Sequence, residues 1–99
     1  MELQEDTIKF IKKYCRVSID SFDDLILSLA DAGIEDMASY GIVFDEKSAK
    51  HMLVLSAFVF SRFSANEKII NAQTKFYSAS IFRMKNQKKQ PKSEVMISD

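Results

Sequence analysis

The stretch that most constrains this chain covers residues 52–60, which are apolar on nearly every side when drawn as a helix. A helix that is hydrophobic all round is normally buried among other elements. The stretch is interrupted by Ser56, and it is far too short to cross a bilayer, which takes about 20 residues. We therefore expect a helix capped by Asp45 and ending near Phe63 to form the centre of the fold, and we expect no membrane insertion.

The composition is that of one small helical domain. The 99 residues are 46% hydrophobic and 28% charged, which is typical of a globular chain rather than a disordered one. Two glycines and one proline leave few signals for tight turns, whereas the many Phe and Met residues suit packed helices. A single cysteine excludes an intramolecular disulfide, so a reducing compartment is the simpler assumption. The polar, acidic beginning of the chain does not resemble a signal peptide.

A short helix is expected over residues 5–14. Ile8, Ile11 and Cys15 recur at spacings of three and four, which places them on one side of that helix. Residues 17–19 are rich in β-branched side chains and lack a helical period, so we expect an extended link there.

A long acidic helix should follow, with Asp20 as its N-cap and Gly41 just beyond its end. Gly33 lies inside this helix at a cost of about 1 kcal/mol relative to Ala, which a close crossing by another helix would explain. The core face indicated by spacings of three and four comprises Phe22, Leu25, Ile26, Leu29, Gly33, Met37 and Tyr40.

The same helix carries more apolar surface than one buried side requires. A second apolar stripe, roughly 100° from the first, consists of Leu27, Ile34 and Ala38. In a small domain, additional apolar surface often marks an oligomer interface.

The sequence is less decisive after residue 66. Residues 67–75 fit either a helix or a loop, and Ser78 is a candidate cap for a last helix through Lys85. Residues 87–99 have the composition of a flexible basic tail, so the predicted division is a helical domain over residues 1–86 followed by this tail. Exposure of the apolar residues 95–97 to water is unfavourable, so we expect them to dock on a partner.

Charge is distributed unevenly although the net charge is zero. Residues 17–46 contain eight acids and no Lys or Arg, whereas residues 83–92 contain five bases and no acid. The two segments are either solvated faces or complementary surfaces through which one copy meets another. The residues predicted for such an oligomer interface are Leu27, Ile34, Ala38, Asp31, Glu35, Arg83, Lys85, Lys88 and Lys89.

The sequence offers little that resembles catalytic or metal chemistry. Cys15 and His51 are the only reactive-looking pair, and they lie on different predicted helices with no further His to build a metal site. We interpret Cys15 as a small buried hydrophobe and His51 as a partly exposed polar residue. The acids that begin at Asp20 lack the glycine and glutamate of a calcium loop, so capping explains them better. We predict that the protein is not an enzyme and has no cofactor.

The residues from 7 to about 67 resemble the head–tail connector family of tailed double-stranded DNA phages and prophages. That family opens with a short helix ending in an Arg–Asp link, continues through acids into a long Leu-rich helix, and then has an apolar third helix. The third helix corresponds to residues 49–63 here, and it ends in a polar stretch with Arg62, Asn66 and Glu67. The other matching positions are Arg16, Asp20, Asp23, Asp24, Leu25, Ile26, Leu29 and Ala32.

The resemblance implies an all-α subunit, a small bundle of three to four helices with a central apolar helix. Such subunits form a ring beneath the portal, extend the DNA channel and dock the next head-completion or tail protein. The implied partners are further copies of the chain, the portal protein and head-completion or tail proteins, with non-specific contact to packaged DNA. The implied location is the virion neck and, before assembly, the cytoplasm of the bacterial host. The alternative is a small helical DNA-associated or regulatory protein that uses its basic C-terminal segment to contact phosphates.

Overall fold

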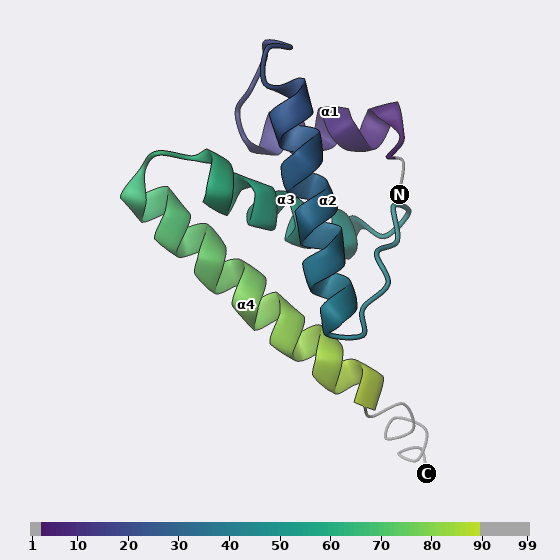
Figure 1. Cartoon of the computed structure of the whole chain (residues 1–99). Helices are drawn as coiled ribbons and strands as arrows, with labels where there is room; N and C mark the ends of the chain where they lie inside the picture. The colour runs from purple at the N-terminus through teal and green to yellow at the C-terminus, as the bar shows by residue number, and fades with distance from the viewer. Residues whose placement is uncertain (1–2, 90–99) are drawn as a thin grey trace.

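Figure 1 shows the computed structural model, which describes residues 3–89 and has, over those residues, four helices and no strand. The predicted all-α class is therefore confirmed. The helices are α1 (Glu5–Tyr14), α2 (Asp23–Ser39), α3 (Ala49–Phe63) and α4 (Glu67–Lys89).

The central position predicted for the apolar helix is confirmed. Every residue from Val54 to Ser61 of α3 is buried, and α1, α2 and α4 all pack against this helix. In Figure 1, α2 crosses in front of α3 and the long α4 runs past both. The cap, however, is Ser48 rather than Asp45: the Ser48 hydroxyl oxygen accepts a hydrogen bond from the N–H of His51 at 3.2 Å.

The Asp45 carboxylate is used in the loop before α3. Its Oδ1 accepts from the N–H of Lys47 at 2.9 Å, which closes a local turn that ends before the helix begins. Asp45 was predicted as the cap because it is acidic and precedes an apolar run, but the helix starts one turn later, where Ser48 has the extended backbone that a cap requires.

α2 crosses α3 closely at Gly33, as predicted. A Cβ atom added to Gly33 would lie 2.7 Å from Leu55 Cδ1 and 2.8 Å from Phe58 Cδ1, both on α3. The missing side chain thus allows the two helices to approach, which offsets the cost of glycine inside a helix.

The predicted core face of α2 is right at its centre and wrong at its edges. Its buried residues are Ile26, Ala30, Gly33 and Met37. Leu25 is 48% exposed because it lies about 100° from Ile26, at the margin of the buried side. Phe22 and Tyr40 are exposed because they are the residues that flank α2 and do not continue its helical repeat.

The start of α2 differs from the prediction, since Asp20 is not its N-cap. The helix begins at Asp23 and is preceded by Phe22, whose side chain makes no capping hydrogen bond. Asp20 Oδ1 instead accepts a hydrogen bond from Lys12 Nζ at 2.7 Å, and Lys12 Nζ also lies 2.8 Å from Asp23 Oδ1. The hydrogen bond to Lys12 lowers the pKa of Asp20, and the same contacts raise the pKa of Lys12. Asp20 therefore connects the segment between α1 and α2 to α1, through Lys12, rather than capping α2.

α4 is one continuous helix, which resolves the ambiguity over residues 67–75. Its first N–H groups are satisfied by Asn66, whose Oδ1 accepts from the N–H of Lys68 and of Ile69. Ser78 lies in the middle of α4 and caps nothing, so the predicted start of a separate last helix is wrong. The helix reaches Lys89, beyond the domain boundary predicted at residue 86. Residues 90–99, with the predicted docking segment 95–97, lie outside the described residues.

α1 and α2 end in the same backbone motif, with different residues at the left-handed position. After α2, Gly41 has φ 82° and its N–H donates to Ala38 O, as expected for the predicted C′ glycine. After α1 the equivalent residue is Arg16, with φ 63°, and its N–H donates to Lys13 O at 3.1 Å. A side chain in this conformation costs about 1–2 kcal/mol, so Arg16 carries local strain that Gly41 does not.

We predict that Gly33→Ala destabilises the protein by about 1–3 kcal/mol, because the new methyl group overpacks the contact with Leu55 and Phe58. Helix propensity alone favours alanine by about 1 kcal/mol, so the sign of the change separates the two effects. Chemical denaturation gives the free energy of unfolding. Ala32→Gly, at the exposed neighbouring position, is the control and should cost about 1 kcal/mol through propensity only. A Gly33→Ala variant more stable than the wild type would contradict the close crossing.

We predict that Arg16→Gly stabilises the protein by about 1 kcal/mol, because glycine adopts positive φ without the steric cost of a Cβ atom. The matched control is Gly41→Ala, which places a Cβ atom at the same motif position after α2 and should destabilise by a similar amount. Thermal and chemical denaturation measure both. Equal stability of Arg16→Gly and the wild type would show that residue 16 is not strained.

Candidate functional site

The α2 part of the predicted oligomer interface divides into a half-buried and an exposed portion. Leu27 and Ile34 are half-buried and pack against the protein's own core. Asp31, Glu35 and Ala38 are exposed. Asp31 and Glu35 each lie about 200° around the helix from Gly33, so they point away from α3. The charges on the exposed side of α2 are therefore all acidic, with Ile34 and Leu27 at the margin of that side.

The α4 part of the predicted interface lies toward the C-terminal end of that helix. Arg83 is exposed, whereas Lys85 is half-buried and its Nζ lies 5.2 Å from the centre of the Tyr40 ring. That distance is within the range of a cation–π contact. Lys88 and Lys89 follow on the last turn of α4. Lys85 is thus partly used within the molecule, while Arg83 projects into solvent.

The structure joins the C-terminal part of α2 to the middle of α4 through residues that the sequence did not single out. Tyr77 Oη donates a hydrogen bond to Asp36 Oδ2 at 2.7 Å. Burial raises the pKa of Tyr77, and the hydrogen bond to Asp36 raises it further, so the phenol keeps its proton. Asp36 is thus used within the molecule. Asp31 and Glu35, by contrast, form no ion pair and no hydrogen bond with another described residue. Arg83 is unpaired in the same sense.

A small groove lies between the end of α2 and α4, beside the Asp36–Tyr77 hydrogen bond. We call it the aromatic groove; its volume is about 210 Å³, and it is lined by Tyr40, Tyr77, Ser78, Ile81, Phe82 and Lys85. Tyr40 is 43% exposed and Phe82 is 65% exposed, whereas Tyr77 and Ile81 are buried. The groove was not predicted, although the position of Phe82, about 140° around α4 from Tyr77, indicates an apolar side chain away from the core.

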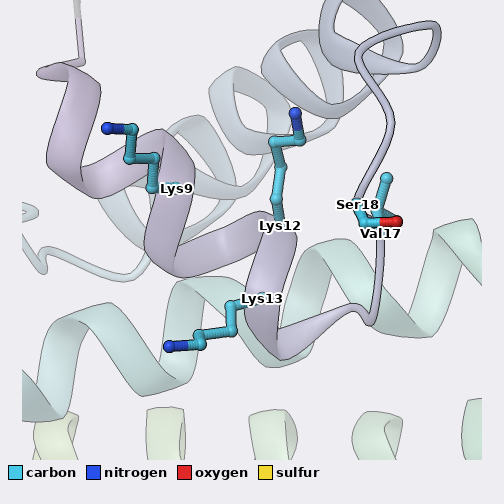
Figure 2. A pocket seen from close by; sticks show the side chains of 5 residues that line it. All are labelled: Lys9, Lys12, Lys13, Val17 and Ser18. Atoms are coloured by element: carbon cyan, nitrogen blue, oxygen red, sulfur yellow. The ribbon is translucent and has the colours of Figure 1, made fainter.

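A second hollow, of about 310 Å³, lies beside α1 and is lined by Lys9, Lys12, Lys13, Val17 and Ser18. Figure 2 shows that the three lysine side chains do not converge: Lys12 points away from Lys9 and Lys13. The ammonium group of Lys12 is also paired with Asp20 and Asp23. The hollow therefore does not present three free cations to one anion.

Cys15 and His51 occupy the environments predicted for them. Cys15 is buried, and this burial raises the pKa of its thiol to about 12, so the nucleophilic thiolate is scarce at neutral pH. His51 is half-buried at the start of α3, and its Nδ1 accepts a hydrogen bond from the N–H of Asp45 at 3.0 Å. No hydrogen bond joins the two side chains.

Over residues 3–89, no group of three or more His, Cys, Asp and Glu side chains is arranged to hold a metal ion. None of the helices described there combines the length and apolar character needed to cross a membrane. Comparisons of the chain with models of protein families, with curated proteins and with solved structures find no match. The features available for a functional argument are thus the charged faces and the aromatic groove of a small all-α bundle.

We predict that stability falls as the pH is lowered from about 7.5 to about 5.5, because of His51. Burial lowers the pKa of His51 below its ordinary value of 6.5, so the folded state favours the neutral ring. The contribution is therefore complete above pH 6.5 and is lost as the pH falls through that value towards the lowered pKa of the folded state. Protonation also removes the acceptor that Nδ1 offers to Asp45.

Urea denaturation at a series of pH values measures this effect. His51 is the only histidine, so His51→Gln should flatten the dependence over this window, in which carboxylates stay ionised. A wild-type free energy of unfolding that is constant or rises on acidification over the same range would contradict the prediction.

Proposed function

We propose that this protein is a structural subunit of a phage or prophage head–tail connector. In this role it forms a ring under the portal, extends the DNA channel and docks the next head-completion or tail protein. The proposal assigns it no enzymatic activity. It also places the protein in the virion neck, and in the bacterial cytoplasm before assembly.

One observation carries the proposal: exposed charges of opposite sign, unpaired among the described residues, lie on two different helices. Asp31 and Glu35 lie on the side of α2 that faces away from α3, and Arg83 lies near the end of α4. A ring built by head-to-tail contacts needs two different surfaces that complement each other. The acidic face of α2 and the basic end of α4 supply such a pair.

The apolar residues beside the acidic face add to this argument. Ala38 is exposed, and Ile34 is only half-buried on the same side of α2. Charged pairs at the rim of an interface give orientation and specificity more than affinity, so a ring contact also needs apolar area. The second stripe of α2 provides that area next to the acids. The resemblance of residues 7–67 to the connector family supports the same assignment.

The proposal can be tested by charge reversal, with oligomers counted by mass photometry and seen by electron microscopy. The wild type should form rings at high concentration, alone or when mixed with its cognate portal protein. Asp31→Lys with Glu35→Lys should raise the concentration needed by about tenfold or more, equivalent to about 1.4 kcal/mol per interface. Arg83→Glu should act in the same direction. A chain with all three changes should recover in part, because the carboxylate introduced at position 83 again attracts the two introduced lysines.

Two exposed charges elsewhere provide matched controls: Asp6→Lys on α1 and Lys75→Glu on α4 should leave assembly unchanged. The absence of rings, both alone and with the portal, would contradict the proposal. A monomer or dimer that shifts a DNA duplex with a steep salt dependence would favour the DNA-associated alternative instead.

A further inference from the structure

The aromatic groove contains exposed aromatic side chains that are not part of the buried core. Phe82 packs on no other described aromatic ring, and 65% of it is exposed. Tyr40, which follows α2, also lines the groove, and its ring contacts Lys85. The buried Tyr77 and Ile81 form an apolar floor, and the Tyr77 hydroxyl is already bonded to Asp36. The groove thus presents two exposed aromatic rings and one cation to whatever occupies it.

We propose that the occupant is the segment of the same chain that contains Val95, Met96 and Ile97. This inference does not rest on the connector function. It follows from three properties of the chain: the reach from the end of α4, the apolar character of these three residues, and the charges beside them.

The chain that follows α4 is long enough to bring residues 95–97 back to the groove. Phe82 lies seven residues before Lys89, so the groove is about 10 Å back along the axis from the end of α4. Val95 lies six positions after Lys89, and an extended chain covers up to about 20 Å over that interval.

The chemistry of the segment matches that of the groove. Methionine fills irregular apolar spaces, and its sulfur makes favourable contacts with aromatic rings such as those of Tyr40 and Phe82. The three apolar residues are flanked by Glu94 and Asp99, and the groove carries the ammonium group of Lys85. An apolar segment between acids thus complements an aromatic groove beside a base.

Paramagnetic relaxation in NMR spectra tests this docking on the full chain. A nitroxide is attached to Ser98→Cys, while the native Cys15 is buried with a raised thiol pKa and should not react. The wild-type chain treated with the same reagent verifies that point. In the labelled chain we expect the resonances of Tyr40 and Phe82 to be lost. Resonances that broaden no more at the groove than elsewhere on α4 would overturn the proposal.

Matched variants separate docking from mere proximity to the end of α4. Met96→Asp should restore the groove resonances, whereas Ser93→Asp, which adds the same charge outside the apolar residues, should leave them lost. On the groove side, Phe82→Ala should restore the Tyr40 resonance, whereas Phe76→Ala, a 39% exposed aromatic on another flank of α4, should not. Equal effects within either pair would overturn the proposal.

A mixed sample distinguishes the same chain from a second copy. Isotope-labelled chains without nitroxide are combined with unlabelled chains that carry it. We expect no loss of the Tyr40 and Phe82 resonances in this mixture. Their loss would show that another copy's segment fills the groove, which overturns docking within one chain.

Discussion

The fold depends on burying α3, and the close contact at Gly33 is what lets α2 complete that burial. α3 is apolar on almost every side, so it is stable only when other helices cover it. At Gly33 the absent side chain allows α2 to approach Leu55 and Phe58 of α3. α1 and α4 cover the remaining sides. The other features of the domain follow from this arrangement, because it determines which face of each surrounding helix is turned to solvent.

The packing of the helices also determines which charged side chains form contacts between helices and which do not. Asp20 and Asp23 contact Lys12 and join α1 to the start of α2, and Asp36 bonds to Tyr77 and joins α2 to α4. These acids hold the helices together. Asp31 and Glu35, on the outer side of α2, form no such contact with the described residues, and neither does Arg83 on α4. The charges that bear on the proposed assembly are therefore those that the bundle does not use.

The sequence predicted helices well and helix starts poorly. The span of α1, the end of α3, the crossing at Gly33 and the left-handed Gly41 all follow from periodicity and from the special backbone freedom of glycine. The starts were harder because several polar residues precede each helix and any of them can cap it. Ser48 and Asn66 do so, whereas Asp45 closes a turn and Asp20 is drawn to Lys12.

By itself the sequence determined an all-α domain with one apolar helix at its centre and an acidic helix against it, because hydrophobic periodicity is a local property. Only the tertiary structure decided that Leu27 and Ile34 partly serve the protein's own core. It also decided that Tyr40 and Phe82 line one groove. Tyr40 directly follows α2 and Phe82 lies on α4, so the two residues are far apart in the chain and no local pattern relates them. Their proximity is a result of how α2 and α4 each pack on α3.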